Sequence, residues 1–245
     1  MTTTAEKRYL QIAMPVALEG IFMILLCNVD LVMVGVLGVS AIAAVSIFNQ
    51  PRMIILCLSR SMASALTLIS AKYFGQGKKE IAADFLKKTL FIGVFILGII
   101  HGAFYIFLDK ILLWMGAEFE YLGDAMIYGE IALVAVFFTS LTAILQAVMI
   151  GFGNTKAVLI ANVQGNVLNV IANGVLIFGM NLGVKGAAIG TVLGTFYTLI
   201  YTMNILKSDK IFDGGNFIPN KKYFKEILPI FGGVFSEQGF ERIGM

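Results

Sequence analysis

The stretch AVLIANVQGNVLNVIANGVLIFGMNLGV, Ala157 to Val184, runs for 28 residues without an acidic or a basic side chain. A helix needs about 20 predominantly apolar residues to cross the hydrocarbon core of a bilayer. This stretch is long enough for one crossing, and it also carries several asparagines among its apolar residues. We therefore predict a membrane-spanning helix with a polar face.

Four more runs of the chain lack charged residues over 20 to 25 positions each. They are Leu31–Pro51, Thr89–Leu108, Ile131–Thr155 and Gly186–Leu206. The whole chain of 245 residues is 58% hydrophobic and 13% charged, whereas a soluble domain has about 25% charged residues. These features exclude a soluble globular class and predict an all-α polytopic membrane protein embedded in a lipid bilayer.

The charge-free runs and their flanks define six predicted spans. They lie near residues 9–33, 45–71, 89–108, 125–150, 157–178 and 186–206. Residues 1–206 would then form a six-helix transmembrane bundle, and the polar segment 207–226 would be a linker on the cytoplasmic side. Residues 227–245 would begin a seventh helix, the first of a second bundle that the chain does not complete.

Basic residues indicate how the bundle is oriented. The predicted loops on the N-terminal side hold thirteen of the 18 Lys and Arg residues, whereas those on the opposite side hold Lys110 and Lys185. Cytoplasmic loops carry an excess of positive charge. We therefore expect a cytoplasmic N-terminus in the plasma (inner) membrane.

A short internal similarity suggests a repeat. Tyr9 is followed by Pro15 and Tyr223 by Pro229, in both cases six residues later. Both segments begin on the basic side of the predicted bundle. Tandem six-helix units in one orientation would produce this pattern. They imply a parent protein about twice as long as the stretch of sequence from Tyr9 to Tyr223.

Asp30 stands out because it lies inside the apolar segment Ile21–Leu37. A charged side chain at the bilayer centre costs about 2.5–3.5 kcal/mol on insertion scales, so such residues often mark ion or solute pathways. A carboxyl in that setting could bind and release a proton. A structural, hydrogen-bonded acid is the alternative interpretation.

The asparagines of the opening stretch are spaced four, three and four residues apart. They are Asn162, Asn166, Asn169 and Asn173, which we call the amide stripe. This spacing places all four side chains on one face of a helix. The stripe is expected to face a water-filled cavity or to hydrogen-bond neighbouring helices, where such bonds contribute about 0.6 kcal/mol each.

Other charges also lie at predicted membrane depth. Arg60 is near the middle of a span, and we expect it to pair with Asp30, Glu19 or Glu130. Arg52, next to Pro51, is expected to extend toward the membrane surface.

In the sixth span, Gly186, Gly190 and Gly194 recur every four residues beside Thr191, which predicts close helix packing.

Enzyme motifs are absent from the sequence. It has no phosphate-binding loop with its lysine, no nucleophile elbow and a single histidine, so we predict that the chain is not an enzyme. It also has no ATP-hydrolysing domain. Any uphill transport must then use an ion gradient or an external partner, and no nucleic acid partner is expected.

Several short motifs together resemble the first half of the multidrug and toxic-compound extrusion (MATE) family. They include Val29-Asp30-Leu31-Val32-Met33-Val34-Gly35 and Gly151-Phe152-Gly153-Asn154-Thr155-Lys156. The segment from Asn169 to Gly179 and the segment Gly183–Thr191 continue the match. The similarity covers nearly the whole chain and implies twelve helices in two bundles around a central cavity.

The resemblance implies export of small organic compounds, often cationic, against entry of protons or sodium ions, with no other cofactor. It implies that the ion-coupling positions are Asp30, Asn169, Asn173 and Thr191, and that Glu237 is the acid of the seventh helix that faces the cavity. The amide stripe adds Asn162 and Asn166 to the expected cavity lining. The family often has Asp where this chain has Asn173. One carboxyl instead of two favours proton coupling over sodium coordination.

Two alternatives to efflux remain open. One is a lipid-linked oligosaccharide flippase of the same superfamily, for which Arg60 would supply a cationic cavity. The other is a non-transporting, truncated fragment. As an exporter, the chain is expected to require a C-terminal bundle or a second copy of itself. An intramembrane enzyme is disfavoured because no nucleophile and base are paired in the sequence.

Overall fold

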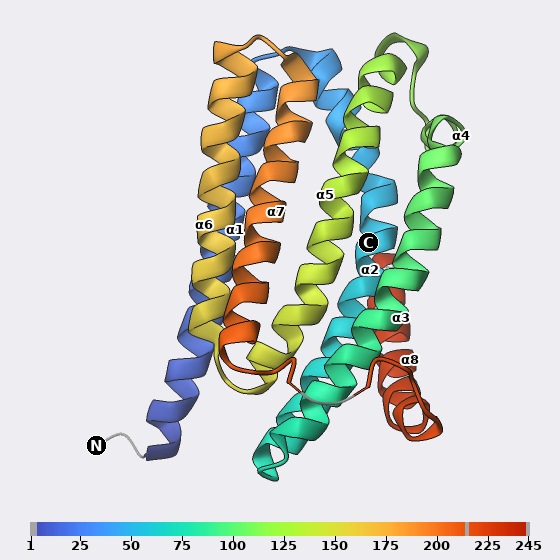
Figure 1. Cartoon of the computed structure of the whole chain (residues 1–245). Coiled ribbons are helices and arrows are strands. Elements are labelled where there is room, and N and C mark those ends of the chain that lie inside the picture. Colours follow the sequence, from blue (N-terminus) through green and yellow to red (C-terminus); the bar gives the residue numbers. More distant parts are fainter. Residues whose placement is uncertain (1–3, 214–215, 244–245) are drawn as a thin grey trace.

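The computed structural model describes residues 4–213 and 216–243, and every regular element within them is a helix. The elements are α1 (Thr4–Gly35), α2 (Val39–Gly75), α3 (Lys79–Ile106), α4 (Leu108–Trp114), α5 (Phe119–Gly151), α6 (Thr155–Asn173), the π-helical turn η1 (Gly174–Gly179), α7 (Gly183–Ser208) and α8 (Lys221–Ile243). In Figure 1, α1, α6 and α7 stand on one side of the bundle and α3, α4 and α8 on the other, with α2 and α5 between them.

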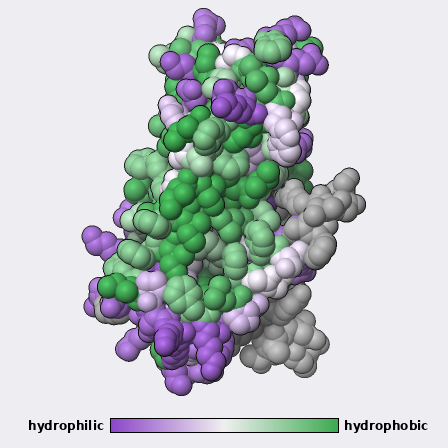
Figure 2. All heavy atoms as spheres, turned by 90° about the vertical axis from the view of Figure 1, so that its right-hand side faces the viewer, coloured by the Kyte–Doolittle hydropathy of each residue, from purple (hydrophilic) through white to green (hydrophobic). Residues whose placement is uncertain are grey.

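Six of these helical segments are long and apolar enough to cross a membrane, as the sequence predicts. They comprise Ala13–Gly35 of α1, the helices α2, α3, α5 and α7, and Thr155–Gly179, which joins α6 to η1. The face in Figure 2 shows a broad hydrophobic band between hydrophilic ends. These observations confirm the predicted class, an all-α integral membrane protein built as a six-helix bundle.

The centre of the bundle is the contact between α2 and α5, the most extensive one in the structure. Phe48, Ile55 and Leu66 on α2 are buried, as are Ile144 and Val148 on α5. These large apolar residues recur at helical spacing along each helix, so the two helices share one continuous apolar interface. This interface holds the α1–α6–α7 side and the α3–α8 side together.

The helices α6 and α7 approach so closely that side chains would not fit at three positions. A Cβ atom built at Gly165 would lie 1.8 Å from Thr198 Oγ1, and one at Gly194 would lie 2.6 Å from the Gly165 carbonyl oxygen. A Cβ at Gly190 would lie 1.9 Å from Asn173 Oδ1. The predicted packing role of the glycine repeat is confirmed, and it brings α7 directly against the amide stripe.

The structure corrects the predicted start of the seventh helix. This helix, α8, begins at Lys221 and not near residue 227, because Asn220 caps it: Asn220 Oδ1 accepts a hydrogen bond of 2.9 Å from the Tyr223 backbone N–H. The prediction also missed the seven-residue helix α4. It is too short to span a membrane and lies at the end of the bundle opposite the N-terminus (Figure 1).

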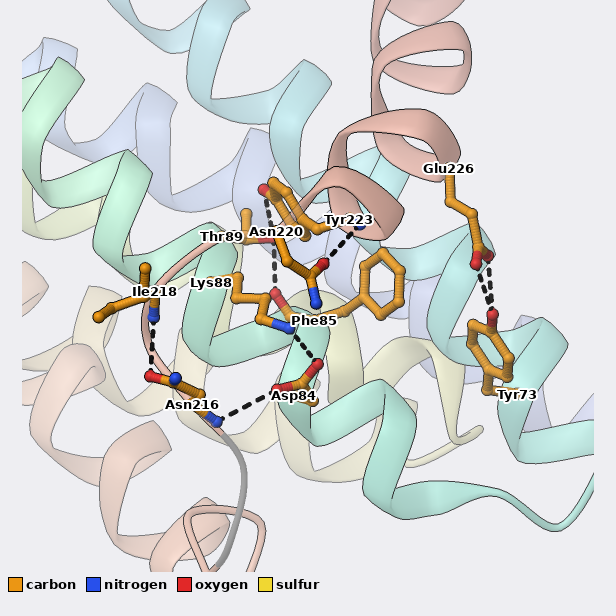
Figure 3. A network of polar contacts seen from close by, with 10 residues as sticks. All are labelled: Tyr73, Asp84, Phe85, Lys88, Thr89, Asn216, Ile218, Asn220, Tyr223 and Glu226. Carbon is orange, nitrogen blue, oxygen red and sulfur yellow. Dashed lines mark hydrogen bonds and ion pairs between the residues drawn. The ribbon is translucent and has the colours of Figure 1, made fainter.

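The segment after α7 and the start of α8 lie against the ends of α2 and α3, as Figure 3 shows. Asp84 Oδ1 accepts a hydrogen bond from the Asn216 backbone N–H at 3.2 Å, and the hydroxyl oxygens of Thr89 and Tyr223 are 3.1 Å apart. The hydroxyl of Tyr73 donates to the Glu226 carboxylate at 2.7 Å. The predicted linker is therefore attached to the first bundle by side-chain contacts.

Candidate functional site

A polar cavity of about 320 Å³ lies inside the part of the bundle formed by α1, α2, α5, α6 and α7. Its charged and titratable lining residues are Asp30, Arg52, Arg60 and Tyr128. The rest of the polar lining consists of amides and hydroxyls: Thr139, Thr142, Gln146, Asn162, Asn166, Asn169, Thr191, Thr195 and Thr198. Three of the four stripe asparagines thus face one cavity, and this supports the first of the two interpretations of the stripe.

The fourth stripe residue, Asn173, holds Asp30. Asn173 is fully buried, and its Nδ2 donates a hydrogen bond to Asp30 Oδ1. Its own Oδ1, which packs against Gly190, has no hydrogen-bond partner among the residues that the structure describes. Most buried polar atoms are hydrogen-bonded, so an unpaired acceptor beside a carboxyl is notable. The π-helical turn η1 begins immediately after Asn173, and such turns are frequent at functional sites.

At the other end of the stripe, Asn162 holds a second carboxyl. Its Nδ2 donates to Glu19 Oε1 and also to Gln146 Oε1 at 3.3 Å. Gln146 Nε2 in turn donates to Asn162 Oδ1 at 2.8 Å and to Thr202 Oγ1 at 3.3 Å. Gln146 and Thr202 are both buried. This reciprocal amide pair fixes Asn162 with its second N–H directed at Glu19.

The two middle asparagines link these ends. Asn166 Nδ2 donates to the Asn162 carbonyl oxygen at 2.7 Å, and Asn169 Nδ2 donates to Thr191 Oγ1 at 3.3 Å. Thr191 itself donates to the Ala187 carbonyl at 2.9 Å. The structure therefore brings Asp30, Asn169, Asn173 and Thr191 into one region, and the amide stripe also bonds to neighbouring helices. The cavity lining and these hydrogen bonds support both interpretations of the stripe.

The position of Arg52 differs from the one expected from the sequence. This residue does not extend toward the membrane surface. It lines the cavity with Asp30, and its guanidinium donates to Asn49 Oδ1 at 3.2 Å. Asn49 gives it a polar partner that a lipid-facing position would lack. Arg60 lines the same cavity, whereas Glu130 on α5 and Glu237 on α8 are exposed and are not among its lining residues.

Of the partners of the amide stripe, sequence reasoning found Thr191 and missed the others. Thr191, Thr195, Thr198 and Thr202 of α7 follow the same spacing of four, three and four residues as the asparagines. Thr139, Thr142 and Gln146 of α5 are spaced by three and four. These spacings place each set on one helix face, so the signal was present in the sequence. Within the described residues, no group of three His, Cys, Asp or Glu side chains is placed to hold a metal ion.

Comparison with known proteins places this site in context. Residues 15–175 match a family model described as MatE. The chain is 25% identical over 190 residues to the uncharacterized transporter YisQ of Bacillus subtilis, covering 76% of this chain and 42% of that protein. It is 25% identical over 234 residues to the probable multidrug resistance protein NorM of Thermotoga maritima, covering 92% of this chain and 50% of that protein.

The fold also matches a solved structure. The crystal structure of the MATE transporter VcmN of Vibrio cholerae in the bent form superposes with a TM-score of 0.88 at 20% identity. The match covers 97% of this chain and 54% of that one. The chain spans about half the length of the curated relatives described above.

Proposed function

Since the chain belongs to the MatE family of membrane transporters, we propose that it forms the cation-coupling half of a multidrug exporter. Such a protein would move organic, often cationic, compounds out of the cell by alternating access, in exchange for protons entering the cell. Sodium ions are the alternative coupling ion. Membership in a transporter family also agrees with the prediction that the chain is not an enzyme.

The observation that carries this proposal is the Asp30–Asn173 pair beside a polar cavity within the membrane-spanning bundle. A carboxyl at this depth is costly to keep charged. A proton from outside would bind to the carboxylate of Asp30 and neutralise it. An organic cation held by the negative charge would then lose that attraction and leave.

Asn173 supports the two states that this exchange requires. While Asp30 is ionised, the amide N–H of Asn173 donates to it. A protonated Asp30 carries an O–H that needs an acceptor. A half-turn of the Asn173 amide would present Oδ1, for which the described part of the chain offers no hydrogen-bond partner. The amide can therefore satisfy either protonation state, and its turn would alter the α6–α7 contact at Gly190.

The remaining parts of the exporter are also proposals. The N-terminus would be cytoplasmic and the membrane would be the plasma (inner) membrane. A second six-helix bundle, or a second copy of this chain, would form the other wall of the substrate pathway. The cavity described here is at the lower end of the roughly 300–1,000 Å³ typical of drug-sized ligands, so the second wall would enlarge it.

The test is proton flux in liposomes that contain the protein as encoded by its gene. With an imposed proton gradient, the wild type should export a lipophilic organic cation and take up protons together. Asp30→Asn should abolish the coupled flux, because an amide cannot bind a proton near neutral pH. The matched control is Asp124→Asn, which removes an exposed carboxyl on α5. Unchanged coupling in Asp30→Asn would refute the proposal. Export driven by a sodium gradient and not by a proton gradient would identify sodium as the coupling ion.

A second candidate function is a lipid-linked oligosaccharide flippase, and the cavity lining favours it in one respect. Two arginines and one acidic residue line the cavity, so an anionic headgroup would find a net positive site. Loss of the gene separates the two functions: an exporter would leave cells sensitive to organic cations, whereas a flippase would leave a cell-envelope defect.

A further inference from the structure

Two carboxyl side chains of α1 pair with asparagines of α6 at the same separation in sequence. Asp30 is bound by Asn173 and Glu19 by Asn162. In both pairs the acid and the amide are 143 residues apart. The helices α1 and α6 run in the same direction (Figure 1). The eleven-residue step between the pairs is close to three full helical turns, so both carboxyls lie on the same face of α1, directed at the same face of α6.

The two sites lie near opposite ends of the membrane span. The span of α1 is Ala13–Gly35, so Glu19 lies six residues from one end and Asp30 five residues from the other. At a rise of 1.5 Å per residue these offsets are about 9 Å and about 8 Å, and the carboxyls are about 16 Å apart along the helix. The Asp30–Asn173 site that we propose for coupling therefore has a partner site toward the N-terminal side.

From this repeat we propose that Glu19 is a second proton-binding group, which receives the proton from Asp30 and releases it at the N-terminal, cytoplasmic side. This inference rests on the proposed function of Asp30. In each cycle a proton adds to the Asp30 carboxylate, passes to the Glu19 carboxylate and leaves as hydronium. Both acids then return to their ionised forms, so atoms and charge balance.

The path between the acids must consist of water. An amide does not give up its protons near neutral pH, so the stripe can orient a proton carrier but cannot replace it. The cavity volume of about 320 Å³ has room for about ten water molecules at ~30 Å³ each. Asn162 lines this cavity and binds Glu19 directly, so the polar path extends from Asp30 as far as the second acid.

The surroundings of Glu19 are suited to holding a carboxylate in a fixed position. Asn162 is clamped by Gln146 on α5, which is held in turn by Thr202 on α7. The charged and titratable groups that line the adjoining cavity are Asp30 on α1, Arg52 and Arg60 on α2, and Tyr128 on α5. From α6 and α7 the lining receives amides, hydroxyls and glycines. Proton transfer to Glu19 therefore competes with no other acid in this lining.

The experiment is infrared difference spectroscopy on a downward pH step, combined with the liposome flux assay, on the protein as encoded by its gene. The wild type should show two protonated-carboxyl bands from this region. Glu19→Gln should remove one and Asp30→Asn the other. Glu19→Gln should also slow coupled proton flux by about a hundredfold, the lower end of the range for loss of a positioned proton-transfer group, while organic-cation binding changes by less than about twofold. Glu19→Asp should restore the flux, and Glu120→Gln, at an exposed acid of α5, should change neither readout.

The two proposals fail separately. Coupling that survives in Asp30→Asn overturns the proposed function. Lost coupling in Asp30→Asn with wild-type flux in Glu19→Gln overturns the role of Glu19 alone. Slowed flux in Glu19→Gln without loss of a carboxyl band would also overturn the proton-binding role of Glu19, because this residue would then act only by positioning Asn162. Size-exclusion profiles matching the wild type show that the variants fold.

Discussion

Gly190→Ala is expected to disrupt the Asp30 site without touching Asp30. The new Cβ would lie 1.9 Å from Asn173 Oδ1 and 3.1 Å from the Asn173 backbone nitrogen. Asn173 is fully buried. Either its side chain leaves Asp30, or α6 and α7 move apart.

The magnitude follows from these contacts. Overpacking a close-packed interior costs about 1–3 kcal/mol, and loss of an interhelical hydrogen bond in a membrane costs about 0.6–1.7 kcal/mol. The sum is about 2–5 kcal/mol, which lowers Tm by about 4–20 °C for a chain of this size. We expect this shift in detergent, together with loss of proton coupling in liposomes.

Gly98→Ala is the matched control, because a Cβ at Gly98 on α3 meets nothing within 4 Å. Alanine is favoured over glycine in a helix by about 0.5–1 kcal/mol, so this variant should be as stable as the wild type or slightly more stable. Wild-type Tm and coupling in Gly190→Ala would refute the assigned contact between Gly190, Asn173 and Asp30.

Two further predictions concern the contacts shown in Figure 3 and their surroundings. Burial favours the neutral form of Glu226, but hydrogen bonds from Tyr73 and Lys72 outweigh it, so the pKa of Glu226 lies below its usual value. The α2–α8 contact should therefore be intact above about pH 4.5 and weaken as the pH falls through the lowered pKa. Hydrogen exchange at 221–228 should rise in that range, and Glu226→Gln should remove the pH dependence. Lys87, nearly fully buried, donates to the Phe212 carbonyl at 2.7 Å, so Lys87→Met should speed exchange at 211–213 by about tenfold, since a lost hydrogen bond of about 1–1.5 kcal/mol has that effect. Lys110→Met, at an exposed lysine of α4, should leave that exchange unchanged.

The membrane-spanning helices could be predicted from sequence because the requirement for them is local. Each predicted span coincides with a helix of the structure, but the helices extend further, as α2 does to Gly75. A helix can continue past the hydrocarbon core, where charged residues such as Lys72 are compatible with it. The π-helical turn after Asn173 was not predictable in this way, since it depends on how α6 meets α7 and not on hydropathy.

At the candidate site, the sequence predicts which residues share a helix face, but it does not predict which acid pairs with which amide. The spacing of the asparagines places them on one side of α6, and the depth of Asp30 singles it out. Which amide binds which acid depends on the register between α1 and α6, and no local pattern fixes that register. Arg52 shows the same limit: its direction is set by Asn49 and the cavity, which form only when the helices pack together.

The most direct test of the central claim is proton release when an organic cation binds to the purified protein. If substrate and proton compete for ionised Asp30, binding and protonation are linked reciprocally. A pH-stat titration with tetraphenylphosphonium, started at a pH where Asp30 is protonated, should release one proton per bound cation from the wild type and none from Asp30→Asn. Equal proton release from both proteins, or cation binding with no release from the wild type, would contradict the account.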